Sequence, residues 1–197
     1  MHAISSNHRK YLTRNPFKRF LIEQFNSRIL RSIDALTPSS LLEVGCGEGF
    51  MTSQIREAFP ETKMEALDIN DRALQIAQEA NPDVTFHCAG VEQLAFEDES
   101  FDLVLCAEVL EHLPGFGKAM TELCRVSKRD IILSVPNEPY FRIMNFLALG
   151  HFRTLGNPPD HLRHWSKDEF VHDMESYLHI DAVYSPFPWT IIVGKKK

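Results

Sequence analysis

The sequence predicts an α/β fold: a doubly wound, Rossmann-like sheet, mostly parallel with an antiparallel last strand, and with helices on both faces. From residue 40 onward, short apolar runs alternate with helical patterns, which is the order of elements in such folds. The first five runs are continuously apolar, as expected for parallel strands that helices cover on both faces. The strands are expected at 41–45, 64–69, 84–88, 102–107 and 131–135, with a closing pair at 180–184 and 190–193.

An amphipathic helix is expected before the sheet, because apolar side chains recur at a helical period between residues 16 and 36. Between the strands, the same period predicts helices at about 51–59, 71–80, 116–126 and 166–177. Ser166 and Glu169 have the spacing of a capping box, which would begin the last of these helices.

One segment interrupts this alternation. About 30 residues separate the fifth strand from the last helix, where ~2–6 are usual. The segment is rich in aromatic residues, so we expect it to fold as a cap over a substrate. The chain is then a single domain in four parts: an N-terminal helical segment (1–37), a cofactor-binding core (38–136), a cap insertion (137–165) and a closing helix and strand pair (166–197).

Composition excludes several classes of protein. The net charge of −6 argues against a general nucleic-acid binder, although the basic first thirty residues leave an anionic substrate as an alternative. No apolar run reaches the ~20 residues of a membrane span, so a cytoplasmic protein is expected. The four cysteines are far apart and fall mostly in apolar segments, which predicts reduced, buried thiols.

Glycines at 45, 47 and 49 lie between the first strand and the following helix, where the missing Cβ atoms let backbone N–H groups approach a ligand. Asp68 follows ~20 residues later at the end of the second strand, where a carboxylate accepts hydrogen bonds from a ribose diol. Together these features predict a ligand that contains adenosine or something like it.

Two residues help to choose the ligand. A dinucleotide fingerprint has a third glycine at the position of Phe50, so a nicotinamide dehydrogenase is disfavoured. Glu43 would repel phosphates but attract an ammonium or sulfonium group. A ligand with a positively charged amino-acid tail is therefore expected.

These segments resemble the motifs of the class I S-adenosylmethionine-dependent methyltransferases, specifically the small type 11-like domains. The resemblance covers roughly residues 40–135 and rests on Leu-Leu-Glu-Val-Gly-Cys-Gly-Glu-Gly, on Ala-Leu-Asp-Ile, and on Phe-Asp-Leu-Val-Leu-Cys-Ala-Glu-Val-Leu-Glu-His-Leu. It implies the following roles: Gly45, Cys46 and Gly47 line the methionine moiety, Asp68 binds the ribose, Ile69 packs on the adenine, Cys106 and Ala107 form the floor near the sulfonium, and Glu43 holds the amino group through water.

The sequence departs from this family at one position. An acidic residue that often accepts from the adenine amino group is replaced here by Gly90. Adenine recognition is then expected to rest on the backbone N–H of Val91 and on Glu92.

Transfer of a methyl group from a sulfonium to an acceptor requires alignment, and a base if the acceptor starts protonated. His112, next to the fourth strand, and His161, within the cap, are the candidate catalytic residues, with His164 as a further candidate.

Glu108, Glu111 and His112 form an ExxEH pattern that also occurs as metal ligands in two methyltransferase groups, which act on RNA ends and in ubiquinone synthesis. Asp160-His161 resembles the first group as well. A divalent ion there would lower the pKa of an acceptor hydroxyl. The pattern also occurs in relatives without metal, so we expect no metal.

The leading hypothesis is an enzyme that methylates oxygen or nitrogen on a small-molecule acceptor and releases S-adenosyl-L-homocysteine. One alternative is a metal-assisted O-methyltransferase of RNA ends or a catechol-like substrate. A second alternative is a non-catalytic module that binds S-adenosylmethionine. The sequence does not determine the acceptor or the oligomeric state.

Overall fold

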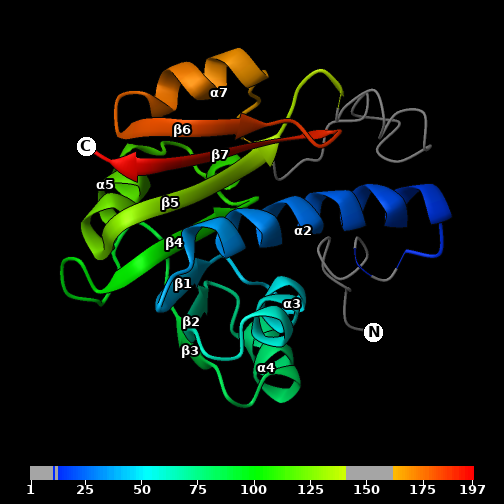
Figure 1. The fold of residues 1–197 in the computed structure, drawn as a ribbon, viewed down its shortest axis with the longest axis vertical. Coiled ribbons are helices and arrows are strands. Elements are labelled where there is room, and N and C mark those ends of the chain that lie inside the picture. Colours follow the sequence, from blue (N-terminus) through cyan, green and yellow to red (C-terminus); the bar gives the residue numbers. More distant parts are fainter. Residues whose placement is uncertain (1–10, 12, 141–161) are drawn as a thin grey trace.

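The computed structural model describes residues 11, 13–140 and 162–197, which form a seven-stranded sheet with helices on both faces (Figure 1). The strand order is β3-β2-β1-β4-β5-β7-β6. β7 is antiparallel to both of its neighbours, and the other pairs are parallel, so the predicted fold is confirmed. The strands are β1 (Ser40–Val44), β2 (Lys63–Asp68), β3 (Thr85–Cys88), β4 (Phe101–Ala107), β5 (Ser127–Pro136), β6 (Leu178–Tyr184) and β7 (Trp189–Lys196).

The α-helices lie close to where the apolar periods predict them. They are α2 (Pro16–Leu36), α3 (Phe50–Ala58), α4 (Asp71–Ala80), the 3₁₀ turn η1 (Leu110–His112), α5 (Gly117–Val126) and α7 (Lys167–Met174). However, α7 ends at Met174 and not at 177, and the 3₁₀ turn η1 was not predicted. Asn15 caps α2 by accepting from the N–H groups of Phe17 and Lys18. The capping box of Ser166 and Glu169 at the start of α7 is also confirmed.

Two apolar cores lie on opposite faces of the sheet. One joins the sheet to α5 and α7 and contains Val44, Val104, Leu133, Met120 and Phe170. The other joins it to α2, α3 and α4 and contains Leu41, Leu105, Ile132, Ile29 and Ile55. Because both faces are covered, β1 and β4 are almost fully buried, which explains their continuous apolar sequences.

The outer strands depart from the prediction. β3 is the edge of the sheet and none of its residues is buried, so its apolar sequence does not indicate a strand covered on both faces. The prediction that its Cys88 is buried is wrong for the same reason: this thiol is exposed, and Cys124 is half-buried, whereas Cys46 and Cys106 are buried. β5 begins at Ser127, four residues before the predicted start, because its polar first residues still pair with β4.

The cap predicted at 137–165 falls largely on residues 141–161, which lie outside the described residues. Its two ends approach each other, since Asn137 forms an isolated parallel bridge with Trp165. Within the described ranges, no helix is long and apolar enough to cross a membrane.

Candidate cofactor and acceptor site

The glycine loop between β1 and α3 has a backbone that only glycine adopts easily. Gly45, Gly47 and Gly49 have φ of 81°, 54° and 78°, in the left-handed region. A Cβ on Gly45 would lie 2.1 Å from Cγ2 of Val109, and one on Gly49 would lie 2.9 Å from Cβ of Ala77. The loop therefore approaches η1 on one side and α4 on the other more closely than any side chain would allow.

Three N–H groups of this loop are hydrogen-bonded within the protein. Those of Gly45 and Cys46 donate to the carbonyl oxygen of Leu67, at 2.8 and 3.0 Å. The N–H of Gly47 donates to Oδ2 of Asp68 at 2.9 Å. The sequence led us to expect N–H groups directed at a ligand; instead, the loop is fastened to the end of β2. These three donors are not available to a pyrophosphate, which would need them.

The carboxylate of Asp68 is held at the end of β2 by backbone donors alone. Its Oδ2 accepts from Gly47, and its Oδ1 accepts from the N–H of Asn70 at 2.8 Å. Each carboxylate oxygen has a second lone pair that can still accept. The two oxygens are thus fixed in place with capacity for two more donors, as the two hydroxyls of a ribose require.

Beside Asp68, the next residue presents a large apolar surface to solvent. Ile69 is 78% exposed, although it directly follows the buried interior of β2. A Cβ on Gly90 would lie 3.8 Å from Cδ1 of Ile69, so these two residues face each other across the ends of β2 and β3. Val91 is buried in the core and Glu92 is exposed. A flat apolar ring placed over Ile69 would cover this exposed apolar surface.

Glu43 lies beneath the glycine loop, almost fully buried. The hydroxyl of Thr52, on α3, donates to its Oε2 at 2.6 Å. Burial raises the pKa of Glu43 to about 7; the Thr52 hydrogen bond opposes this shift, and the nearby Asp68 charge adds to it. No Lys or Arg within the described residues forms an ion pair with Glu43 or Asp68. A cation brought close to this pair would be attracted and would lower the pKa of Glu43.

The cysteines of the two motifs are core residues. Cys106 is fully buried at the end of β4, on the α5 side of the sheet, and burial raises the pKa of its thiol. Cys46 is buried on the opposite side, with its pKa raised by the same cause. Their side chains therefore belong to the apolar cores, while Ala107 is partly exposed.

The residue after Ala107 has an unusual backbone conformation. Glu108 has a φ of 59°, and its N–H donates to the carbonyl oxygen of Ser134 on β5. Its Oε2 accepts from Nε1 of Trp189 at 2.7 Å, which joins the ends of β4 and β7. Such a backbone angle is uncommon for a residue other than glycine and often marks a functional position.

The three residues of the ExxEH pattern lie in different surroundings. Glu108 is turned toward Trp189, Glu111 is 1% exposed within η1, and His112 is partly exposed at the end of η1. In the part of the chain that the structure describes, no three His, Cys, Asp or Glu side chains are grouped closely enough to bind one metal ion.

Of the other candidate bases, His161 lies outside the described residues. His164 lies near the carboxyl end of β5, with its Nδ1 3.7 Å from Oε1 of the buried Glu138. The chain just before it returns to η1, because the N–H groups of Leu162 and Arg163 both donate to the carbonyl oxygen of Glu111. The structure thus brings the C-terminal end of the predicted cap beside His112.

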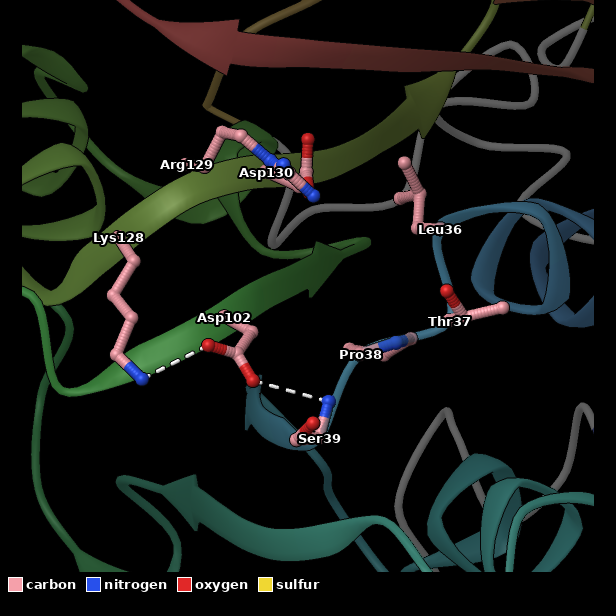
Figure 2. A pocket seen from close by; sticks show the side chains of 8 residues that line it. All are labelled: Leu36, Thr37, Pro38, Ser39, Asp102, Lys128, Arg129 and Asp130. Carbon is pink, nitrogen blue, oxygen red and sulfur yellow. Dashed lines mark hydrogen bonds and ion pairs between the residues drawn. The ribbon is translucent and has the colours of Figure 1, made fainter.

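A hollow of about 440 Å³ lies at the opposite, amino edge of the sheet (Figure 2). Its charged groups neutralise one another: Asp102 accepts from Nζ of Lys128 at 2.9 Å and from the N–H of Ser39 at 3.0 Å. Arg129 and Asp130 form a second ion pair at 2.9 Å. None of the predicted site residues lines this hollow.

Several partners of the site residues carry no signal in the sequence. Thr52, which orients Glu43, is an ordinary helix residue, and Trp189 lies 81 positions from Glu108. Tyr11 stacks on Phe50 with ring centroids 4.7 Å apart and so covers the start of α3. Helical periodicity is enough to predict that α2 packs on the sheet, but it does not predict the contact between the rings of Tyr11 and Phe50.

Comparison with known proteins agrees with this geometry. Residues 42–135 match the family model described as "Methyltransferase domain". The malonyl-(acyl-carrier protein) O-methyltransferase of Bacillus cereus is 33% identical over 95 residues, 47% of this chain and 35% of that protein. The ubiquinone biosynthesis O-methyltransferase of Hahella chejuensis is 31% identical over 140 residues, 66% of this chain and 57% of that protein. The matched part of the chain therefore spans 35% and 57% of the length of these two relatives.

A solved structure extends the likeness to nearly the whole chain. The magnesium protoporphyrin IX methyltransferase of Synechocystis, with bound S-adenosylhomocysteine, superposes with a TM-score of 0.72 and 18% identity, covering 96% of this chain and 92% of that one. At this identity the match shows the fold. Together with the family match, it shows that residues 42–135 form a class I, type 11-like S-adenosylmethionine-dependent methyltransferase domain.

Proposed function

We propose that the chain transfers a methyl group from S-adenosylmethionine to an oxygen or nitrogen atom of a small-molecule acceptor and releases S-adenosyl-L-homocysteine. One arrangement carries the proposal: a fixed carboxylate (Asp68), an exposed isoleucine (Ile69) and a buried carboxylate (Glu43) surround a glycine loop whose N–H groups are already satisfied. This arrangement favours a nucleoside with a cationic tail over a dinucleotide.

The positions of the candidate cofactor-binding residues support a role for each in this proposal. Asp68 accepts from the ribose hydroxyls, and Ile69 covers one face of the adenine, while the backbone of Val91 and the exposed Glu92 are nearest to its polar edge. The backbone of Gly45, Cys46 and Gly47 borders the methionine part. Glu43 attracts its ammonium group, with water between them because the carboxylate is buried beneath the loop.

On the acceptor side, the cofactor supplies the electrophilic methyl group, and the chain aligns the acceptor and removes its proton where one is present. We propose that His112 or His161 accepts this proton, since each is close in sequence to a segment that reaches the carboxyl edge of the sheet. The cap of residues 137–165 would enclose the acceptor. The names of the relatives refer to malonyl-(acyl-carrier protein) in one case and to ubiquinone biosynthesis in the other, so they do not point to a single acceptor for this chain.

Isothermal titration calorimetry tests the cofactor. S-adenosylmethionine and S-adenosylhomocysteine should both bind, and NAD and NADP should not; tighter binding of a dinucleotide would reject the proposal. Once an acceptor is found, activity that is lost on chelation and restored by magnesium would favour the metal-assisted alternative. Binding without transfer to any acceptor would favour the non-catalytic module.

A further inference from the structure

A groove of about 390 Å³ runs between α2 and the turn that joins β6 to β7. In Figure 1 the N-terminal part of α2 and this turn lie on the same side as the arrowheads of β4 and β5, the carboxyl edge of the sheet. α2 contributes Phe20, Leu21, Gln24, Ser27, Arg28 and Arg31, and the turn contributes Tyr184, Ser185, Pro186 and Phe187. None of the site residues assigned above lines the groove.

Exposed aromatic rings gather around this groove. Phe20 is 53% exposed and Phe187 is 46% exposed, and both line it. Phe17, one helical turn before Phe20, is 58% exposed, and Tyr140, 51% exposed, lies with its ring centroid 6.0 Å from that of Phe187. Four of the seven large, exposed hydrophobic residues in the described ranges therefore border one surface. A cluster of this kind usually marks an interaction site.

The same groove carries positive charge without a compensating carboxylate. Its cations are Arg28 and Arg31, and none of the described residues that line it is acidic. The guanidinium of Arg28 lies 4.4 Å from the centroid of the Tyr184 ring, so it interacts with an aromatic face and not with a carboxylate. In the hollow at the amino edge, by contrast, Lys128 and Arg129 are each paired with an aspartate.

We propose that this groove docks the protein onto a lipid bilayer surface that carries anionic headgroups. The guanidinium groups of Arg28 and Arg31 bind headgroup phosphates, and the rings of Phe17, Phe20 and Phe187 enter the boundary between headgroups and acyl chains. Basic side chains beside exposed aromatic rings are the combination that interfacial segments use. A chain with a net charge of −6 can approach an anionic surface only through such a local basic face.

The charges also favour a bilayer over a second copy of the chain. A symmetric dimer formed through this groove would place the arginines of both copies against each other, and no acidic residue of the groove would separate them. Docking through this groove would leave the carboxyl edge close to the membrane, because Trp189 follows the groove's turn and reaches Glu108. This inference does not depend on the proposed methyl transfer.

Sedimentation of the full chain with vesicles of phosphatidylcholine, with and without phosphatidylglycerol, tests the proposal. The protein should bind the mixed vesicles, and added salt should weaken the binding. Replacing Arg28 and Arg31 together by Gln should weaken it by roughly 25-fold, because each cation near an anionic surface contributes about fivefold. Phe20→Ser with Phe187→Ser should weaken it by at least about tenfold, since two rings no longer enter the interface.

Matched changes on α4 provide the control. Arg72→Gln and Ile76→Ser remove an exposed cation and an exposed apolar side chain from a different face, and they should leave vesicle binding unchanged. Since all the substituted side chains are at least partly exposed, circular dichroism should show each variant folded. The proposal is overturned if the mixed vesicles do not bind the protein, or if the α4 variants lose as much binding as the groove variants. It is also overturned if light scattering shows a dimer that the Arg28→Gln, Arg31→Gln variant dissociates.

Discussion

The two edges of the sheet use their carboxylates in opposite ways. At the amino edge, Asp102 is held by the ammonium group of Lys128, whose hydrogen bond lowers the pKa of this carboxyl (Figure 2). At the carboxyl edge, Glu43 and Asp68 are held by a hydroxyl and by backbone N–H groups, which are neutral donors. The charges of the first edge are satisfied by the fold, whereas those of the second remain available to a cationic ligand.

The largest effect is expected at the loop that shapes the carboxyl edge. Gly45→Ala should reduce the free energy of unfolding by about 3 kcal/mol, because the residue has a positive φ and its Cβ would overlap the stiff side chain of Val109. Gly115→Ala is the matched control, since a Cβ there has no neighbour within 4 Å, and it should change stability by less than about 0.5 kcal/mol. Urea unfolding of both variants measures the difference; equal midpoints would mean that the loop does not require glycine.

Glu43 should make stability depend on pH. Its pKa is about 7 in the folded protein and 4.5 as the ordinary value, so the folded state binds more protons between these values. Its contribution is fully present below pH 4.5 and is lost as pH rises through 7, a change of up to about 3 kcal/mol. Glu43→Gln should abolish this loss, so the variant should gain stability over the wild type at pH 8 but not at pH 4.5.

Unfolding in urea at pH 4.5 and pH 8 measures this effect. Glu79→Gln, exposed on α4, should leave the difference between the two pH values as in the wild type. If the stability of Glu43→Gln changes with pH as that of the wild type does, the pKa of Glu43 is near its ordinary value, and the carboxylates of the two edges differ less in their surroundings.

Asp68→Ala should weaken the binding of S-adenosylhomocysteine by about 1–3 kcal/mol, because it removes two charge-assisted acceptors and releases the N–H of Gly47. Asp181→Ala, which removes an exposed aspartate paired with Lys195, should leave this affinity unchanged. Calorimetry with both variants decides whether Asp68 contacts the ligand: unchanged affinity would remove it from the site.

The smallest effect is expected at the amino edge. Lys128→Gln breaks a partly exposed ion pair with Asp102, and such pairs contribute about 0–1 kcal/mol to stability. The affinity for S-adenosylhomocysteine should stay as in the wild type. A change in that affinity would show that the amino edge influences ligand binding at the carboxyl edge, so the two edges would not be independent.

The backbone of the candidate cofactor half was predictable from sequence because its pattern is local. Three glycines after a strand and an aspartate after the next strand define a loop and an edge, and the structure places them together. The sequence led to the prediction that Glu43 attracts a cation, but not to its burial against Thr52. That burial depends on how α3 packs on β1, which no short pattern encodes.

The acceptor half depends on contacts between distant residues. The ExxEH pattern left open the alternative that its three side chains bind one metal ion, although none was expected; in the structure, Glu108 accepts from Trp189 and Glu111 is buried within η1. Likewise, an apolar sequence predicted β3 as an enclosed strand, whereas its neighbours in the sheet decide that it lies at the edge. Periodicity reports which residues are apolar, but only the topology decides which of them are covered.

The order of the last three strands also constrains how the chain can fold during synthesis. β6 emerges from the ribosome before β7, yet it pairs only with β7, which inserts between it and β5. β6 therefore has no hydrogen-bonding partner in the sheet until β7 has been made. Trp189, the first residue of β7, is the one that binds Glu108. The carboxyl edge is consequently completed only after β7 has been made, so a nascent chain can contain the whole glycine loop while this edge still lacks the contact between Trp189 and Glu108.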